Sequence, residues 1–556
     1  MLHPQLRGSV LPKPSYHMVP LTKEVTDLSG FSDPDTFYPG LRILTGLTIK
    51  PKTSVWLDHR NRIISSATAL SNSSSGRIDL KIEKNCKETG IEVQDVSGFR
   101  KITHLLDPVR WLQGRYDSEK IKEKLDDPMN QAYVEALAAY SLGKLKEEDA
   151  SPHFHAFYGA FSVTADRYAY NISDSYMSFR HCRWFWANQE NGIFKLAFDD
   201  SLPADVKAAI LDIPDDLSDD DSDAETEKTE ELLDDFNRAH EKEVSNSIHS
   251  LSDDGIHTES DNDDEDKDKD KDEDDESESE DDEVNLFAEI KDFPVMMIYT
   301  ESSEDTMDEL LDDYEELGCE PGSEEWDATW TAWIFQIISA LTVGQRIFGL
   351  THNDLHSNNI VWSKTDKEFL YYKTNDGLLF KVPTYGKIFK IIDFGRSIFK
   401  INENLFYSDD FRVGNDAGDQ YSFGDLYDSN SGAEEVGPNP SFDLSRFTVS
   451  VFESLFPETP PKRKNGVVLS KERGLIVKET ESDLYNLLWT WLLCDDDHNV
   501  LIDPNGGERY PDFDLYKVIA AQVHNAIPSE QIRKPIFESF RVSTAPANQK
   551  VYSLFV

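Results

Sequence analysis

The 556-residue sequence predicts a protein of the α+β class, with a strand-rich region and a larger, mainly helical region. Between residues 41 and 105, short apolar segments alternate with turn residues, as in the strands of a small sheet. Residues 130–145 and 325–348 instead carry apolar side chains at helical spacing. With 38% hydrophobic residues, the chain can bury a sizeable core.

The same two periodicities predict the elements in chain order. The small sheet is expected to include 53–57, 78–82 and 99–106, and the Ala- and Leu-rich helix at 130–145 follows it. Aromatic residues then suggest a strand after a turn at 151–162. The later elements are a buried strand at 293–300, helices at 305–311 and 325–348, and a strand at 388–392.

Residues 214–283 form an acidic, low-complexity segment. They hold 34 Asp and Glu residues against 6 Lys and Arg, a net charge of −28 out of −50 for the whole chain. Such a segment buries too little apolar surface to offset the entropy of ordering it, so we predict disorder. It is expected to act as a solvating linker or as an arm that binds basic proteins. The acidic balance argues against nucleic acid and against anionic membranes as partners.

Several absences bear on the expected compartment. No run of about 18 apolar residues predicts a membrane span, and the first residues lack the apolar core of a signal peptide. The four cysteines are far apart in sequence, which is typical of reduced thiols and not of a zinc site. We therefore expect a cytoplasmic or nuclear protein that is not secreted and has no membrane partner.

The segment 349–362, GLTHNDLHSNNIVW, follows a predicted helix and leads into an apolar strand. An Asp on such a loop, Asp354, is well placed to meet a substrate and to act as a base. Asn359 offers a neutral oxygen to Mg²⁺, which prefers hard oxygen ligands. His352 is expected to pack and hydrogen-bond so that it fixes the loop.

A second segment, 386–399, GKIFKIIDFGRSIF, contains a strand that ends at Asp393. Phe394 is expected to anchor in the core, and Gly395 permits unusual backbone dihedral angles. Asp393 thus adds a carboxylate at a strand end, where a metal can be held. Phosphoryl transfer needs such groups, because a carboxylate must orient the acceptor and oxygen ligands must hold Mg²⁺ on the phosphates.

Together and in this order, the two segments resemble the catalytic loop and the Asp-Phe-Gly loop of the protein kinase superfamily. The resemblance implies a bilobed protein-kinase-like fold, with a small β-rich N-lobe that contains the acidic insertion and a larger α-helical C-lobe. It implies a phosphotransferase that uses ATP and Mg²⁺, and it favours a Ser/Thr protein kinase acting on protein hydroxyl groups. The implied catalytic residues are Asp354, Asn359 and His352, and the implied metal ligands are Asn359 and Asp393.

The resemblance also suggests which residues anchor ATP. Glu135, in the helix predicted at 130–145, is the candidate partner of an ATP-anchoring lysine. Lys101 is favoured as that lysine because it lies in the middle of a predicted strand before this helix. Lys81, in the preceding strand, is the rival. For either lysine, a position on the surface of an edge strand is the alternative.

Other positions follow from the same resemblance. Residues 294–300 resemble the strand that enters the hinge, so the backbone groups of Ile298 and Thr300 are expected to face adenine. Asp443 lies at the start of a predicted helix, and its carboxylate would bond back to the catalytic loop. No Gly-x-Gly-x-x-Gly motif occurs, and the small residues of 71–76 are its expected replacement at the phosphates.

Three features depart from the common protein-kinase pattern. Asn353 stands where many kinases have Arg, so we expect that phosphorylation of the loop after Asp393 is not the main switch. His356 replaces the usual catalytic-loop Lys, as in haspin, UbiB-type and aminoglycoside or choline kinases. The 34 positions from Asn359 to Asp393 exceed the roughly 13 of common kinases, which predicts an inserted hairpin at 363–386.

Two alternatives to a protein kinase remain open. His356 favours a small-molecule kinase of the aminoglycoside or choline type. A non-catalytic pseudokinase scaffold, which recruits partners through the acidic segment, is the other alternative. The presence of Asp354, Asn359 and Asp393 together favours catalysis, and the Asp-Phe-Gly triplet favours a protein substrate.

The resemblance also divides the chain into regions. The segments THLLDPVRWLQGRY, DPMNQAYVEALAAY and SPHFHAFYGAF are similar to kinase-like proteins of large DNA viruses of algae and protists, which implies a host cell or a virion as the location. The expected regions are an unassigned extension at 1–40, the first part of the N-lobe at 41–213, the acidic insertion at 214–283, the end of the N-lobe and the hinge at 284–300, and the C-lobe at 301–556.

Overall fold

The computed structural model describes residues 18–20, 25, 28–46, 55–66, 75–86, 90–198, 203–214, 217–218, 286–313, 317–427 and 434–556. The acidic segment at 214–283 therefore lies outside the described residues apart from 214 and 217–218, and the expected phosphate loop lies outside them at 71–74. Contacts divide the chain into two units. Met1–Leu106, Ser118–Thr164 and Pro294–Val556 form unit 1, and Asp107–Asp117 and Ala165–Phe293 form unit 2. The predicted α+β class is confirmed.

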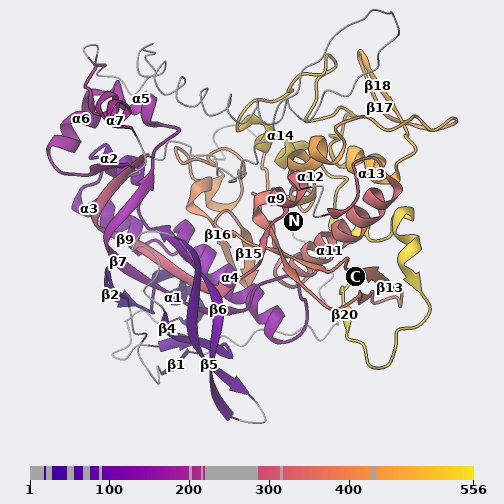
Figure 1. The fold of residues 1–556 in the computed structure, drawn as a ribbon, viewed down its shortest axis with the longest axis horizontal. Coiled ribbons are helices and arrows are strands. Elements are labelled where there is room, and N and C mark those ends of the chain that lie inside the picture. Colours follow the sequence, from indigo (N-terminus) through magenta and orange to yellow (C-terminus); the bar gives the residue numbers. More distant parts are fainter. Residues whose placement is uncertain are drawn as a thin grey trace, which may run out of the picture. The chain divides into compact units, whose positions relative to one another are not determined.

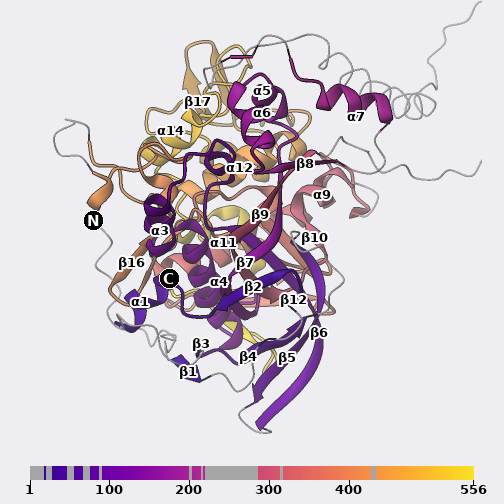
Figure 2. The same cartoon turned by 90° about the vertical axis from the view of Figure 1, so that its left-hand side faces the viewer.

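A mostly antiparallel sheet is the main β structure of the chain (Figure 1). Six of its strands are β2 (Phe31–Asp35), β4 (Asn61–Ser66), β5 (Gly76–Cys86), β6 (Gly90–His104), β7 (Phe157–Asn171) and β9 (Leu286–Glu301). Residues 165–171 of β7 and 286–293 of β9 belong to unit 2, and the rest of these six strands belongs to unit 1. They are arranged in the order β2–β7–β9–β6–β5–β4, so that β9 and β6 are interior strands. Figures 1 and 2 show β5 and β6 as a long hairpin, and its strands contain the predicted segments 78–82 and most of 99–106.

Helix α4 (Gln131–Glu147) is the Ala- and Leu-rich helix that the sequence predicts. It packs closely on β7, because a Cβ atom at Gly143 would lie 2.8 Å from the Cβ of Phe157. Asn130 caps the helix, with Oδ1 accepting from Ala132 N at 3.1 Å. The amide nitrogen of Asn130 donates to the carbonyl oxygen of Leu105 at 2.8 Å, which ties the start of the helix to the end of β6.

The longest helix, α11 (Glu324–Phe348), matches the second helix predicted from helical spacing. Its side chains are buried along nearly all of its length, including Trp326 and Trp333. Ser323 caps the helix by accepting from Trp326 N at 3.1 Å, and Gly349 ends it with a φ of 61°, in the left-handed region that favours glycine. None of the helices in the described part of the chain has both the length and the apolar character needed to cross a membrane.

We expect Asn130→Ala to lower the free energy of unfolding by about 2 kcal/mol, the upper end of the range for helix caps. The reason is that Asn130 is buried and also donates two hydrogen bonds to carbonyl oxygens. Ser323→Ala, at the less buried cap of α11, is the control and should cost about 1 kcal/mol. Urea unfolding of both variants measures the difference, and equal losses would contradict the special role of Asn130.

Two short antiparallel strands hold the loop that contains Asp354. They are β11 (Ile360–Lys364) and β14 (Lys387–Ile391), and Ile360 is paired with Ile391. Because the loop enters β11 and the Asp-Phe-Gly triplet follows β14, this register brings the two segments to the same end of the strand pair. The predicted strand at 388–392 is thus β14, shifted by one residue.

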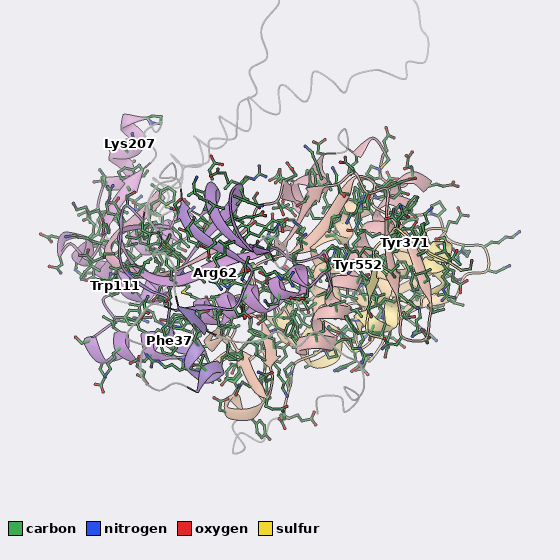
Figure 3. All side chains as sticks on the ribbon, turned by 90° about the horizontal axis from the view of Figure 1, so that it is seen from below. Phe37, Arg62, Trp111, Lys207, Tyr371 and Tyr552 are labelled. Carbon is green, nitrogen blue, oxygen red and sulfur yellow. The ribbon has the colours of Figure 1, made fainter. Side chains whose placement is uncertain are left out.

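The predicted hairpin at 363–386 is present. It consists of β12 (Phe369–Lys373) and β13 (Leu379–Pro383), which pair antiparallel. The strand β20 (Val551–Ser553) pairs with β12 in parallel, so that Tyr371 and Tyr552, both labelled in Figure 3, lie on neighbouring strands. The inserted hairpin therefore forms one sheet with β20 and is an integral part of the fold.

Cys182 in unit 2 and Cys319 and Cys494 in unit 1 are the cysteines whose side chains are described, and they form no disulfide.

The remaining described elements of unit 1 are as follows. The other helices are α1 (Pro39–Thr45), α3 (Ser118–Asp126), α9 (Met307–Asp312), α12 (Phe442–Leu455), α13 (Asp483–Trp491), α14 (Asp514–Gln522) and α15 (Pro528–Gln531). The other strands are β1 (Met18–Pro20), β3 (Val55–Leu57), β10 (Asp305–Thr306), β15 (Ile398–Ile401), β16 (Asn404–Tyr407), β17 (Val468–Glu472), β18 (Leu475–Lys478) and β19 (Arg541–Val542).

Unit 2 is a small aromatic-rich body. Phe185 is fully buried there and contacts Tyr176 and Phe194 at ring-centroid distances of 6.1 and 5.1 Å. These contacts pack the aromatic side chains of this unit against one another. Its described elements include α2 (Pro108–Leu112), α5 (Tyr176–Arg180), α6 (Arg183–Glu190), α7 (Ala204–Leu211) and β8 (Lys195–Phe198), which pairs with the first residues of β9.

Candidate active site

A buried carboxylate fixes the loop that precedes β11. Asp443, in the first turn of α12, is fully buried. It accepts from the backbone N–H of His352 at 2.9 and 3.0 Å and from that of Asn353 at 2.9 Å. Burial raises the pKa of Asp443, and the hydrogen bonds from the loop oppose this shift. The contact that the sequence suggested between this carboxylate and the loop is therefore present.

His352 is the packing residue of the same loop. Its side chain is fully buried, and its ring lies 5.3 Å from the ring of Phe394. Nε2 donates to the carbonyl oxygen of Ile392 at 2.8 Å, and Nδ1 accepts from Asp354 N at 3.3 Å. Since a carbonyl only accepts, the proton of the neutral ring is on Nε2. His352 thereby links the loop to the residue before Asp393.

Asn353 has a φ of 68°, a left-handed conformation that Asn tolerates better than most residues. Its amide nitrogen donates to the carbonyl oxygen of Arg396 at 2.9 Å, and the hydroxyl of Tyr421 donates to its Oδ1 at 2.7 Å. Asn353 therefore bonds directly to the segment that follows the Asp-Phe-Gly triplet.

The carboxylate of Asp354 has a partner that the sequence did not indicate. The hydroxyl of Tyr516, in α14, donates to Asp354 Oδ1 at 2.9 Å. The Tyr516 ring stacks on Phe513 at a centroid distance of 5.1 Å and lies 5.1 Å from the guanidinium carbon of Arg446. Because 162 residues separate the two hydrogen-bonded residues, no local pattern could have paired them.

Asn359 and Asp393 lie at the same end of the β11–β14 pair. The backbone N–H of Ile392 donates to the carbonyl oxygen of Asn359 at 3.0 Å. The Asn359 amide nitrogen donates to the carbonyl oxygen of Asp354 at 2.9 Å and contacts His356 Nε2 at 3.0 Å. Burial lowers the pKa of His356, which favours the neutral ring that can accept this bond. These bonds use the amide nitrogen of Asn359, so its oxygen is the atom suited to a cation.

Lys101 joins β6, α4 and the Asp-Phe-Gly segment. Its ammonium lies 2.5 Å from Glu135 Oε1 and 2.8 Å from Asp393 Oδ1. Glu135 is buried, and its other oxygen accepts from the hydroxyl of Thr103 at 3.2 Å. Lys81 instead pairs with Asp95 at 2.9 Å, and the two side chains are 47% and 83% exposed. The structure thus places Lys101 at the candidate site and Lys81 on the surface of the sheet.

The electrostatics of this cluster follow from burial and from the charge of Lys101. Burial lowers the pKa of Lys101, but Asp393 and Glu135 outweigh it and raise the pKa above its ordinary value. Burial raises the pKa of Asp393, and the lysine charge outweighs burial, so that the pKa falls below its usual range. For Glu135, burial raises the pKa and Lys101 offsets it only in part. Lys101 is therefore charged at neutral pH, and Asp393 is ionised.

Ile298 and Thr300, the residues expected to face adenine, lie in an interior strand of the sheet. Ile298 pairs with Lys101 and Thr300 pairs with Phe99 in the β6–β9 ladder, and β9 has β7 on its other side. Backbone groups of an interior strand are used by its neighbours. The ladder with β6 includes Glu301, so the strand continues one residue beyond the predicted segment 293–300.

The described residues fit a Mg²⁺ ion that is shared with a nucleotide. Asp393 supplies an ionised carboxylate that is 42% exposed, and Asn359 supplies an amide oxygen. Mg²⁺ in such sites takes one or two protein oxygens and completes its shell with phosphate and water. Within the described residues, no group of three or more His, Cys, Asp or Glu side chains could hold a metal alone. The oxygens of Asp393 and Asn359 are thus of the kind that Mg²⁺ prefers.

Comparison of the chain with protein-family models and with curated proteins found no match in either case. The chemistry is therefore inferred from the site itself. That site contains Asp354 on a loop that Asp443 holds in place. It also contains the oxygen donors Asn359 and Asp393, and the charged Lys101 between Glu135 and Asp393.

Proposed function

We propose that this chain is an ATP- and Mg²⁺-dependent phosphotransferase of the protein-kinase-like, bilobed class, and that it acts on Ser or Thr hydroxyl groups of proteins. The observation that carries the proposal is the position of the Lys101 ammonium, 2.5 Å from Glu135 and 2.8 Å from Asp393. Asp354 and Asn359 lie on the loop fixed beside Asp393. This arrangement assembles residues from distant parts of the sequence that phosphoryl transfer requires together.

Each residue has a distinct part in the proposed reaction. Lys101 binds the phosphates of ATP, and Glu135 keeps the ammonium in place. Asn359 and Asp393 hold Mg²⁺, which neutralises charge on the β- and γ-phosphates when it is bound. Asp354 orients the acceptor hydroxyl and takes its proton. The acceptor oxygen forms a bond to the γ-phosphorus as the bond to the β-phosphate oxygen breaks, which yields a phosphoester and ADP.

A small-molecule kinase is the second candidate, and His356 is the observation that favours it. His356 binds Asn359 at 3.0 Å in place of the Lys of common protein kinases, so the loop lacks that positive charge. A protein acceptor remains the first candidate because the Asp-Phe-Gly triplet is present and a long segment separates it from Asp443. A non-catalytic scaffold would not need Asp354, Asn359 and Asp393 together.

We expect Lys101→Met to weaken Mg²⁺·ATP binding or to lower phosphotransfer by about 10²-fold or more, because the positively charged partner of the phosphates is lost. Lys81→Met is the matched control, since it makes the same change on the neighbouring strand at a surface ion pair. Calorimetric titration with Mg²⁺·ATP and a radiolabelled phosphotransfer assay measure the two effects. If the Lys81 variant lost function and the Lys101 variant did not, the proposed site would be in the wrong place.

A further inference from the structure

A short turn after the Asp-Phe-Gly triplet is fastened to the start of α4. This turn, η2 (Asp409–Phe411), begins with Asp409, whose side chain is 2% exposed. Asp409 Oδ1 accepts from Gln131 N at 3.0 Å, and Oδ2 forms an ion pair with the ammonium of Lys124. The backbone N–H of Asp409 donates to the carbonyl oxygen of Met129 at 2.8 Å. One buried residue thus contacts the first N–H of α4, the carbonyl of Met129 just before that helix, and Lys124 of α3.

The contact with Gln131 N completes the cap of α4. The first N–H groups of a helix have no acceptor within the helix. Asn130 supplies acceptors for two of them, its Oδ1 for Ala132 N at 3.1 Å and its carbonyl oxygen for Tyr133 N at 2.9 Å. The acceptor for Gln131 N comes from Asp409, 278 residues later. A carboxylate at this end is also favoured by the helix dipole.

Two further contacts join the chain after Asp393 to the start of α4 and to the residues just before it. Arg412, directly after η2, forms an ion pair with Asp127. Gly395 lies against Gln131, because a Cβ atom at Gly395 would be 3.0 Å from Gln131 Nε2 and 3.3 Å from its Cγ. The glycine of the Asp-Phe-Gly triplet therefore packs on the first residue of the helix that contains Glu135.

The other side of the segment contacts the loop of Asp354. Phe411 is buried, and its ring meets that of Tyr421 edge-on at a centroid distance of 5.3 Å. The hydroxyl of Tyr421 donates to Asn353 Oδ1 at 2.7 Å, directly before Asp354. The segment thus connects helix α4 with the loop that holds the candidate base.

We propose that Asp409 is a positioning residue for the proposed phosphotransfer, an inference that rests on that function. Glu135 lies four residues after Gln131, about one helical turn, so a fixed helix start also fixes where Glu135 meets Lys101. The carboxylate of Asp409 holds this arrangement without any covalent modification of the segment.

The test compares Asp409→Ala and Asp409→Asn with the control Asp483→Asn. Asp483 is a suitable control because it lies in the first turn of α13 and pairs with Arg463 at 2.7 Å. Amide hydrogen exchange of residues 131–135 is measured together with the melting temperature and with kcat and KM for ATP, well below that temperature. Phosphatase treatment of the unmodified protein is a further arm.

Asp409→Ala is expected to speed exchange at the start of α4 and to lower kcat, each by about 10- to 100-fold, as for the loss of a hydrogen bond to a charged group. Asp409→Asn should have a smaller effect, because its amide oxygen still accepts from Gln131 N, and it keeps the test decisive if the Ala variant does not fold. Asp483→Asn and phosphatase treatment should leave kcat unchanged.

The inference is overturned if exchange at 131–135 is unchanged in the Asp409 variants, or if their melting temperature falls while kcat does not. Loss of kcat after phosphatase treatment would also overturn it. If the unmodified protein transfers no phosphate, the proposed function fails by itself. Faster exchange in the variants would then still support the role of Asp409 in holding α4, and unchanged exchange would still refute it.

Discussion

Replacing Asp354 by asparagine is expected to lower phosphotransfer by about 10²- to 10⁴-fold, the contribution typical of a general base. The amide keeps the size of the side chain but cannot take a proton from the acceptor hydroxyl. The fold should be preserved, since the loop is held by Asp443 and His352 and the amide oxygen can still accept from Tyr516. Affinity for Mg²⁺·ATP should be unchanged, because the proposed phosphate and metal ligands are other residues.

The measurement is kcat for phosphotransfer, with Mg²⁺·ATP affinity determined on the same preparations. Asp366→Asn is the control, because Asp366 is exposed on the connection between β11 and β12 and makes the same chemical change outside the site. Acceptors should include mixed proteins and small molecules with hydroxyl groups, so that the labelled product identifies the acceptor class. Equal activity of the unmodified and Asp354→Asn proteins would remove the catalytic assignment.

The sequence predicted the local parts of this site well because each depends on a few neighbouring residues. The helix that becomes α4 has strong helix formers, and the strand that ends at Asp393 has an apolar run bounded by a polar residue. The inserted hairpin was visible from the excess spacing between Asn359 and Asp393. Each of these signals falls within one segment of the chain.

The contacts between distant segments could not be predicted in the same way. Tyr516 and Asp409 are ordinary residues in their own segments, and only the fold brings them to Asp354 and to the start of α4. The position of Ile298 and Thr300 inside the sheet could not be predicted for a related reason. Strand β9 continues to Glu301, and a one-dimensional pattern does not show where an interior strand loses its last neighbour.

Asn353 shows how a departure from a common pattern acquires a physical explanation. The sequence indicates only that Asn353 stands where many kinases have Arg. In the structure, Asn353 occupies a left-handed position and bonds to Arg396 and Tyr421, so that the loop is joined to the following segment by neutral hydrogen bonds. The connection between the loop and the following segment therefore needs no Arg that binds a phosphate, which agrees with the role proposed for Asp409.

Replacing Asp393 by asparagine is expected to raise the Mg²⁺ concentration for half-maximal activity by at least about 100-fold. Loss of a residue that hydrogen-bonds to a metal ligand already lowers metal affinity or activity by about 10- to 100-fold. Here a charged ligand itself would be lost. Asp393 has a φ of 62°, a conformation that Asn also tolerates, so the backbone should not be strained by the change. Titration of phosphotransfer with Mg²⁺ at fixed ATP measures the midpoint.

This variant separates two effects of Asp393 that the structure combines. Its carboxylate is a candidate metal ligand and also a partner of Lys101 at 2.8 Å. In the variant, Lys101 keeps Glu135 as a partner at 2.5 Å, so it should remain charged and positioned. A shifted Mg²⁺ midpoint with recovery of activity at high Mg²⁺ would therefore reflect the metal. Asp503→Asn, in an exposed loop, should leave the midpoint unchanged. If activity fell in the Asp393 variant but the midpoint did not move, Asp393 would act through Lys101 alone, and Mg²⁺ would have to be held by other oxygens.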